Sequence, residues 1–325
     1  MTQPLPCLVA DVGGTNTRVA LAGVGAIRPE SVRRYANAAF PGLAAVLEQF
    51  RADARCEAPA GACVAVAGPV RGGVGRLTNR DWFFDGASLA AATGARIVAV
   101  LNDLQAQGHA LGHIAPEALH PVIAGQPEPG GAQLVIGIGT GFNAAPVHEA
   151  PGGRIVAPSE CGHVALPVRS DADLRLSRFV ALEHGFPEVE EVLSGRGIAQ
   201  VDALLAQEAG EGGAPRDSAA ILAALDQGEP RARQTAAICV RILGAVAGDL
   251  ALIHLPFGGV HLVGGMARAL APWLDAFGFA AAFRDKGRFA PLMADFPVWV
   301  IEDDFAALTG CARHLAHLMA DAAAR

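Results

Sequence analysis

Short apolar runs alternate with amphipathic stretches along the chain, and this pattern predicts an α/β fold. In the first third, the apolar runs predict strands at residues 5–10, 19–22, 31–35, 62–67 and 97–101. The amphipathic stretches between them predict helices at residues 40–52 and 88–92.

A turn-rich break at residues 126–131 precedes a second series of elements. This series predicts strands at 134–138, 144–148, 260–263 and 298–301, and helices at 171–183, 197–206, 218–225, 230–254 and about 305–319. In both series a strand, a glycine turn and another strand follow one another. The recurrence predicts two lobes of related design that face each other across a cleft.

The first glycine turn has the sequence Asp11-Val12-Gly13-Gly14-Thr15-Asn16. Adjacent glycines let backbone N–H groups turn toward a phosphate, and Thr15, Asn16 and Thr17 add side-chain donors. Because a carboxylate needs a cation between itself and a phosphate, Asp11 suggests a Mg²⁺ ion. The alternative is an ordinary β-hairpin in which Asp11 caps the turn. The sequence has neither a Walker A loop nor a dinucleotide-binding fingerprint here.

Two further glycine-rich segments lie at the ends of predicted strands. The segment Gly137-Ile138-Gly139-Thr140-Gly141-Phe142 is a hairpin turn or, together with the first turn, the second half of a triphosphate site. Gly264-Gly265 gives a flat backbone against which adenine or ribose can lie, although close packing between a strand and a helix also explains it.

Asn102 and Asp103 end the strand predicted at 97–101, where ligands collect in open α/β sheets. Asp103 can accept the proton of an alcohol that attacks a γ-phosphate. It can equally be the N-cap of a helix that starts at Leu104, and the two roles are compatible.

The segments Glu160-Cys161-Gly162-His163 and Glu191-Val192-Leu193-Ser194-Gly195 carry two carboxylates and an imidazole on glycine-flanked loops. Such a trio suits the vicinal hydroxyls of a sugar. A metal site would need a helical Glu-x-x-His pair, which Pro158 and Gly162 argue against. The alternatives are that His163 only packs and that Glu191 belongs to a solvated acidic run with Glu188 and Glu190.

Composition and charge narrow the class of partner. The 325 residues carry a formal charge of -7 and no basic run, which argues against nucleic acid. The longest apolar stretch, residues 238–265, contains Arg241, Asp249 and His254, so we expect a buried helix and strand rather than a membrane span. The six cysteines are scattered, and the N-terminus shows no export signal, which favours reduced thiols and a cytoplasmic protein.

The order of motifs resembles that of bacterial glucokinases of the type without a zinc site, along nearly the whole chain. The motifs are D-V-G-G-T-N at 11–16, T-N at 78–79, N-D at 102–103, G-T-G at 139–141, E-C-G-H at 160–163, E-V-L-S-G-R-G at 191–197, G-G-V-H-L-V-G-G at 258–265 and D-K-G-R-F at 285–289.

The resemblance implies a two-lobed, actin-like (ribonuclease H-like) sugar-kinase/ATPase fold with a central interlobe cleft. Residues 1–106 and 304–325 would form a small lobe that includes the C-terminal helix, and residues 107–303 a large lobe with sugar- and nucleotide-binding elements. The resemblance also implies ATP, Mg²⁺ and D-glucose as partners, commonly in a homodimer.

Site residues follow position by position from the resemblance. Asp103 would be the base that deprotonates the sugar 6-hydroxyl, and Asp11 would hold the metal through water. The hexose-binding set would be Asn79, Asn102, Glu160, His163 and Glu191. Nucleotide would be bound by Gly13, Gly14, Thr15, Asn16, Gly139, Thr140, Gly264 and Gly265. The cysteine cluster of zinc-containing sugar kinases does not follow His163 in this sequence.

Two positions depart from the family pattern. The usual G-T-G-L-G becomes Gly139-Thr140-Gly141-Phe142-Asn143, which places nucleotide affinity or donor preference in question. The middle of E-G-G-H is Cys161, a thiol that would make the sugar site sensitive to alkylation if exposed.

The leading hypothesis is therefore an ATP:D-glucose 6-phosphotransferase whose lobes close over glucose and exclude water. One alternative is a kinase for another hexose or an amino sugar. The other is a non-catalytic sugar sensor on the same fold, although the first strand starts too early to leave room for a helix-turn-helix segment.

Overall fold

The computed structural model describes residues 5–23, 25–77 and 80–324, which form two compact units. Unit 1 comprises Met1–Ile114, Pro151–Val156 and Asp303–Arg325, and unit 2 comprises Ala115–Ala150 and Ala157–Glu302. Unit 1 thus includes residues 107–114 and Pro151–Val156, which the sequence-based division at residue 106 assigns to the other lobe.

Unit 1 is built on a mixed sheet with the strand order β3-β2-β1-β5-β9, and β4 pairs with β2. The strands are β1 (Cys7–Val12), β2 (Asn16–Gly23), β3 (Ala26–Ile27), β4 (Arg33–Ala36), β5 (Gly61–Val66) and β9 (Ile97–Asn102). Strands β1 and β2 form an antiparallel hairpin, whereas β1, β5 and β9 are parallel. A second small sheet contains β6 (Val70–Arg71), β7 (Val74–Arg76) and β8 (Phe83–Phe84).

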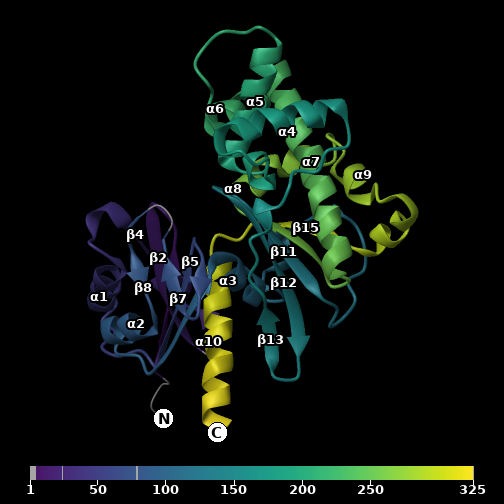
Figure 1. Cartoon of the computed structure of the whole chain (residues 1–325). Helices are drawn as coiled ribbons and strands as arrows, with labels where there is room; N and C mark the ends of the chain where they lie inside the picture. The colour runs from purple at the N-terminus through teal and green to yellow at the C-terminus, as the bar shows by residue number, and fades with distance from the viewer. Residues whose placement is uncertain (1–4, 24, 78–79, 325) are drawn as a thin grey trace. The chain divides into compact units, whose positions relative to one another are not determined.

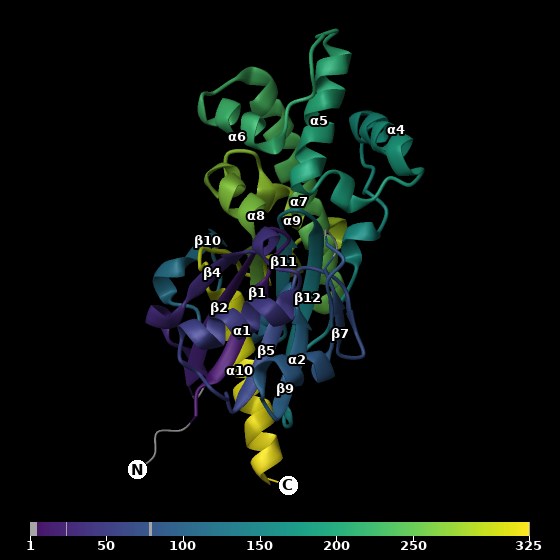
Figure 2. The same cartoon turned by 90° about the vertical axis from the view of Figure 1, so that its left-hand side faces the viewer.

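Helices cover both faces of this sheet. Because successive strand residues point to opposite faces, Leu8 and Ala10 of β1 pack in the core with α1 (Leu43–Asp53) and α2 (Gly86–Thr93). Val9 packs instead with α3 (Asp103–Ala110) and α10 (Ala306–Ala324). Figure 1 shows α1 and α2 on one side of the sheet and α3 and α10 on the other, and Figure 2 looks onto the α1 and α2 side.

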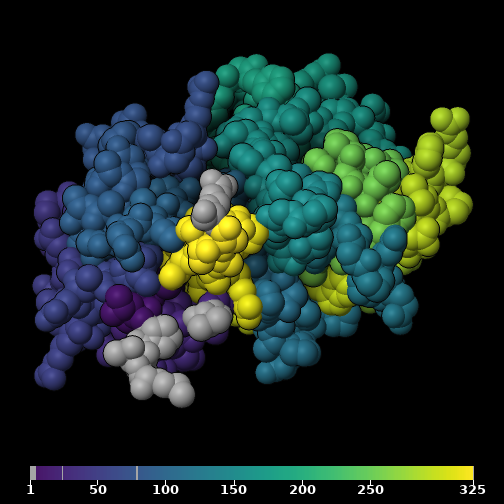
Figure 3. Space-filling view, turned by 90° about the horizontal axis from the view of Figure 1, so that it is seen from below, coloured from purple at the N-terminus to yellow at the C-terminus, as the bar shows by residue number. Residues whose placement is uncertain are grey.

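The contact between α3 and α10 is close because Gly310 has no side chain. A Cβ added at Gly310 would lie 1.7 Å from the carbonyl oxygen of Ala106. At the other end of α10, residues 320–324 are exposed, and this end reaches the surface in the view of Figure 3. Strand β13 (Gly153–Val156) also packs against α3.

Unit 2 contains a sheet in which five strands follow the order β10-β15-β14-β11-β12. These are β10 (Leu119–Ile123), β11 (Gln133–Ile138), β12 (Phe142–Ala150), β14 (Gly259–Val263) and β15 (Val298–Ile301). Strands β11 and β12 form an antiparallel hairpin, and β11, β14 and β15 are parallel. The order β12-β11-β14-β15 therefore repeats the directions of β2-β1-β5-β9, so the predicted relation between the two halves is confirmed in their topology.

The helices of unit 2 are α4 (Asp171–His184), α5 (Gly195–Glu208), α6 (Ser218–Asp226), α7 (Pro230–His254), α8 (Gly265–Leu270) and α9 (Phe279–Arg284). Helix α7 is long and apolar enough to cross a membrane by length and composition, but 67% of its apolar window is buried inside the protein. It packs closely on α9, since a Cβ at Gly244 or Gly248 would lie within 2.5 Å of a carbonyl oxygen of α9. The expected buried helix followed by a strand is confirmed.

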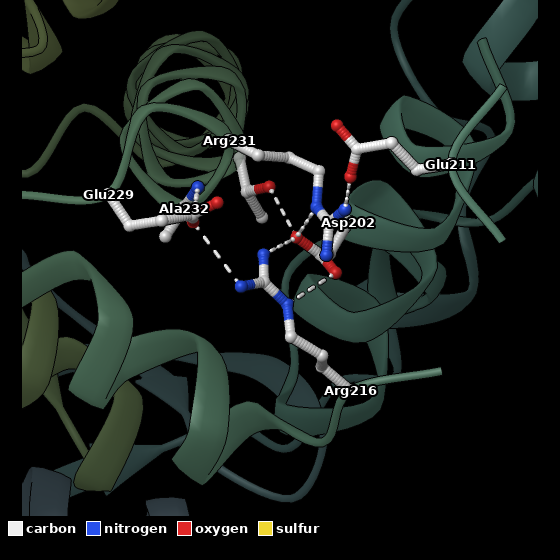
Figure 4. A network of polar contacts seen from close by, with 7 residues as sticks. Asp202, Glu211, Arg216, Glu229, Arg231 and Ala232 are labelled. Carbon is white, nitrogen blue, oxygen red and sulfur yellow. Dashed lines mark hydrogen bonds and ion pairs between the residues drawn. The ribbon is translucent and has the colours of Figure 1, made fainter. Parts of the chain in front are cut away.

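A buried ionic cluster joins α5, α7 and the segment before α6. Asp202 is only 2% exposed, and its carboxylate accepts hydrogen bonds from Arg216 and from Arg231, whose Nε lies 3.1 Å away. Arg216 also contacts Glu229 at 3.3 Å, and Arg231 contacts Glu211. Figure 4 shows the two guanidinium groups converging on Asp202. Each charge in the cluster thus has a partner of opposite sign, as burial requires.

Candidate active site

In unit 1, the first glycine turn and the Asn102-Asp103 pair lie at the same edge of the sheet. Val12 is in register with Val66 on β5, and Val66 is in register with Asn102 on β9. The turn after β1 and the start of α3 are therefore two strands apart, at the carboxyl ends of parallel strands where ligands collect in open α/β sheets.

Asn102, and not Asp103, is the N-cap of α3. The Asn102 side-chain oxygen accepts from the backbone N–H of Gln105 at 2.6 Å, and the Gln105 side chain accepts from the Asn102 N–H at 3.1 Å, which completes a capping box. Asp103 is the first helical residue, and its Oδ1 accepts from the N–H of Leu104 at 2.9 Å. The alternative in which Asp103 caps the helix is wrong, and its carboxylate sits where a helix N-terminus stabilises negative charge.

The first turn is held from outside by Asn37, which is fully buried. The Asn37 amide donates to the carbonyl of Gly13 at 2.7 Å, and its backbone N–H donates to the carbonyl of Thr15 at 2.9 Å. Thr17 is buried and donates its hydroxyl to Asn37 at 2.8 Å, so it supports the turn and does not face a ligand. Thr15, in contrast, is exposed at the tip.

Asp11 lies at the end of β1 with 23% of its side chain exposed. Burial raises the pKa of this carboxyl, although Arg18 opposes the shift, with a nitrogen 3.8 Å from Asp11 Oδ2. Arg18 also donates to the carbonyl of Asp304 at 3.1 Å. A carboxylate whose charged form is disfavoured by burial gains from a bound cation. The position therefore fits a divalent ion held by oxygen ligands.

In unit 2, the second glycine turn is braced by an acidic side chain. The Phe142 N–H donates to Glu190 Oε2 at 2.8 Å, and the Gly195 N–H donates to the carbonyl of Gly139 at 2.8 Å. A Cβ on Gly141 would lie 2.5 Å from the Glu190 carboxylate, whereas a Cβ on Gly139 would meet no atom within 4 Å. Gly139 and the exposed Thr140 therefore leave open space against the backbone, as a phosphate site needs.

Gly264 lies beside this turn and is required by the backbone. Its φ is +103°, and an added Cβ would lie 2.4 Å from the carbonyl oxygen of Ile138. The explanation by close packing is thus sufficient for Gly264. Gly265 starts α8, and a Cβ there would meet no atom within 4 Å, so this glycine borders open space.

Glu191 is completely buried, so it does not belong to a solvated acidic run. Its Oε1 accepts from Arg196 at 2.7 Å, whereas its Oε2 has no hydrogen-bond partner among the described residues. Glu183 and His184 place ligand atoms near Glu191, all within 4.8 Å of one another. Arg196 pairs with Glu191 at 2.7 Å and with Glu190 at 3.6 Å, so the charge of Glu191 has a partner without a metal ion.

Glu160 is the N-cap of the short 3-10 helix η4 (Cys161–His163), and His163 is its last residue. His163 is 52% exposed, and its Nδ1 lies 2.9 Å from Glu188. This hydrogen bond and the negative charge of Glu188 raise the pKa of His163. The Glu160 side chain is exposed and accepts from the Nδ2 of Asn143 at 3.1 Å.

Gly162 brings η4 onto the second turn. A Cβ on Gly162 would lie 2.0 Å from the carbonyl oxygen of Phe142. Unit 2 thus assembles Gly139, Thr140, Glu160 and His163 around one tightly packed loop region. Asn79, the remaining predicted sugar ligand, lies outside the described residues.

Sequence reasoning missed the residues that hold these loops: Asn37, Asn143, Glu188, Glu190 and Arg196. The run that contains Glu188, Glu190 and Glu191 carried a usable signal, because each acid is adjacent to an apolar residue of a buried segment. No comparable signal identifies Asn37, whose partners lie about twenty residues earlier in the chain.

Comparisons with known proteins identify the family and fold of this chain. The glucokinase family profile matches residues 8–318. The chain is 33% identical to the glucokinase of Chromohalobacter salexigens over 95% of this chain and 97% of that protein. A crystal structure of a glucokinase from an Antarctic psychrotroph matches with a TM-score of 0.85 and 30% identity, covering 96% of this chain and 99% of that one. The Balamuthia mandrillaris glucokinase in complex with glucose matches in fold, with a TM-score of 0.79 and 22% identity over 96% of this chain and 93% of that one.

Proposed function

The chain belongs to the glucokinase family, and we propose that the residues described above transfer the γ-phosphoryl group of ATP to the 6-hydroxyl of D-glucose. It is an ATP-dependent hexose phosphotransferase with an actin-like sugar-kinase fold. The residue roles below, together with Mg²⁺, the homodimer and the cytoplasmic location, are our proposals.

The buried Glu191 carboxylate is the observation that carries the sugar assignment. A buried carboxylate oxygen without a donor is costly, and a substrate hydroxyl would supply the missing hydrogen bond. Arg196 holds the other oxygen at 2.7 Å and so fixes the direction in which the free one points. Glu160 and His163 supply further acceptors and donors for sugar hydroxyls, and Asn79 belongs to the same proposed set.

We assign the proton transfer to Asp103. Its Oδ1 accepts from the N–H of Leu104, which orients the carboxylate, and we assign to this carboxylate the proton of the sugar 6-hydroxyl as that oxygen attacks phosphorus. Asn102 uses its side-chain oxygen in the helix cap, so its amide N–H group is the part assigned to a sugar hydroxyl.

The phosphates are assigned to the two glycine turns, at Gly13–Asn16 and Gly139–Thr140, and the adenosine to Gly264 and Gly265. Asp11 would hold Mg²⁺, because its partly buried carboxylate fits a cation. When bound, this ion would neutralise phosphate charge. Arg18, at 3.8 Å from Asp11, would keep the carboxylate oriented.

The first experiment measures ADP release from Mg-ATP with glucose, mannose, fructose, glucosamine or N-acetylglucosamine, beside a control without sugar. We expect strong release with glucose. ADP release with another sugar alone would mean that this sugar is the substrate and that the mechanism is unchanged. No release with any sugar would favour a sensor and contradict the proposal.

Asp103→Asn tests the catalytic base. The substitution keeps the shape and the hydrogen bond from Leu104 but removes the proton acceptor, so kcat should fall about 10²–10⁴-fold. Glucose binding measured by calorimetry should change little. Asp321→Asn, at the half-exposed end of α10, is the matched control and should retain full activity. Turnover near that of the wild type in Asp103→Asn would remove Asp103 from this role.

We also propose a homodimer and a cytoplasmic location. All six cysteines are unpaired, as is usual in a reducing compartment. Light scattering after size-exclusion chromatography tests the dimer, for which a monomer mass near 33.2 kDa would be the contrary result.

A further inference from the structure

Asn143 occupies the position where the family's turn usually has glycine, and its side chain has several partners. It lies on β12 opposite Gly137 of β11. Its Oδ1 accepts from the N–H of Ala144 at 2.8 Å, from the N–H of Cys161 at 3.1 Å and from the hydroxyl of Ser159 at 3.0 Å. A glycine would offer none of these contacts.

The other end of the same amide reaches Glu160. The Asn143 Nδ2 donates to the carboxylate of Glu160 at 3.1 Å and to the carbonyl of Ser159. The reverse orientation of the amide would point its N–H groups at the N–H groups of Ala144 and Cys161, so the surrounding donors determine which way it lies. The donor is therefore directed at Glu160 by the rest of the network.

The side-chain hydrogen bonds connect Asn143 with the segment 159–161, which carries the proposed sugar ligand Glu160, rather than with the glycine turn at 139–141. Its partners Ser159, Glu160 and Cys161 precede or begin η4, whereas the turn itself is braced by Glu190 and Gly195. Glu160 is exposed, and an exposed carboxylate without a fixed partner samples several rotamers. One donor at 3.1 Å restricts that freedom before the sugar arrives.

We propose that Asn143 is a positioning residue that orients the Glu160 carboxylate for the sugar, so that this departure from the glycine turn acts on hexose binding and leaves nucleotide binding unchanged. This inference rests on the proposed role of Glu160 as a sugar ligand. It assigns the substituted turn position to substrate recognition.

Asn143→Asp is the sharpest single test. Aspartate keeps the shape and the acceptor for Cys161 but replaces the donor facing Glu160 with a second negative charge. We expect KM for glucose to rise about tenfold or more, because a charge-assisted hydrogen bond is lost and a repulsion is added. KM for ATP should stay within about twofold, a difference too small to reflect a lost contact. His148→Gln, exposed on the same strand, is the control and should change neither constant.

A double-mutant cycle shows whether Asn143 acts through Glu160. Asn143→Ala should weaken glucose binding in the wild-type background and have little further effect in Glu160→Ala, which has no acceptor for the Asn143 amide. Additive effects, or a rise in KM for ATP with KM for glucose unchanged, would overturn the inference. If the alanine variant does not fold, Asn143→Ser retains a small polar group and replaces it in the cycle.

Failure of this inference is distinguishable from failure of the proposed function. A wild-type protein that releases no ADP with glucose would refute the function itself. A wild type that turns over normally, with glucose constants unchanged in both Asn143 variants, would refute only the positioning role.

Discussion

In unit 1 the imidazoles of His109 and His314 contact each other between α3 and α10, with ring centroids 4.4 Å apart and planes tilted by 43°, whereas in unit 2 the carboxylate of Asp202 lies between two arginines. Burial lowers the pKa of His109 to about 3 and that of His314 to about 4, so both rings are neutral. Burial opposes the charge of Asp202 too, but hydrogen bonds from Arg216 and Arg231 outweigh it and lower that pKa.

Two sheets of the same topology are thus surrounded by different kinds of buried titratable group. Unit 1 keeps the buried pair His109 and His314 uncharged and packs the two rings together, and unit 2 keeps Asp202 charged and pairs it. Asp173 of α4 is kept charged in the same way as Asp202, since hydrogen bonds from Arg241 and Ser170 lower its pKa against the effect of burial. The two units should therefore respond differently to acid and to substitution.

Removal of Asp202 should have the largest effect on stability. Asp202→Ala leaves the guanidinium groups of Arg216 and Arg231 without their shared partner, and breaking a buried ion pair costs about 3–5 kcal/mol. Urea unfolding followed by tryptophan fluorescence measures this in a Trp82→Phe background, where Trp273 and Trp299 both belong to unit 2. Asp226→Ala, exposed at the end of α6, is the control. A loss as small as that of the control would show that the cluster contributes little.

Mild acid should affect unit 1 first. The unfolded chain protonates its histidines near pH 6.5, whereas the folded protein keeps His109 and His314 neutral down to about pH 3 and 4. Protons therefore favour the unfolded chain as pH falls below 6.5, by at most about 1.4 kcal/mol per pH unit for each histidine. The lowered pKa of Asp202 and of Asp173 protects unit 2 until the pH falls below their usual values near 4.

Hydrogen exchange from pH 7 to pH 5 tests this order, after correction for intrinsic rates. Amides of α3 and α10 should lose protection while those of α5 and α7 keep theirs. His109→Leu should remove part of the pH dependence, and His148→Gln, on an exposed position, should not. Equal loss of protection in both units would contradict the distinction between neutral and paired buried groups.

Much of the framework was predictable because it follows from local patterns. Helix α7 and strand β15 begin and end where the sequence predicts. Length identifies the first as a helix, and the β-branched and aromatic residues that follow Pro297 identify the second as a strand. The prediction missed β10, which contains His120 and Pro121 and pairs only at the edge of the sheet through β15. Helix α9 was missed because its packing against α7 is long-range.

The glycine turns of the candidate site were predictable from the sequence, but the side chains that hold these loops in place were not. Glycine pairs after strands are visible in the sequence, as are Asn102 and Asp103 after β9. The hydrogen bonds from Asn37 to Gly13 and from Asn143 to Glu160 join segments that only the folded chain brings together. For the same reason the cap of α3 was assigned to the wrong neighbour, because the choice depends on Gln105 turning back to the Asn102 N–H.

Substitution of Asp11 should have the smallest effect on stability, and it should stabilise the protein where Asp202→Ala destabilises it. It is a partly buried acid of unit 1 with a pKa raised by burial, so the folded protein holds its proton more tightly than the unfolded chain does. Stability therefore falls as pH rises from the usual carboxyl range through the raised value, and the loss remains at pH 7. Asp11→Asn removes this penalty while it preserves shape, and we expect Tm at pH 7 to rise by about 1–3 °C.

The same substitution should lower kcat/KM by about 10²-fold or more, because the carboxylate proposed to hold Mg²⁺ is lost. Added Mg-ATP should raise the Tm of the wild type and have little effect on the variant. Asp53→Asn, on α1, provides the contrast: hydrogen bonds from Tyr35 and Gln49 lower the pKa of Asp53, so its substitution should not stabilise the protein. A lower Tm for Asp11→Asn would mean that the contact with Arg18 outweighs burial. Asp11 would then be stabilised in its charged form by an arginine, as Asp202 and Asp173 are.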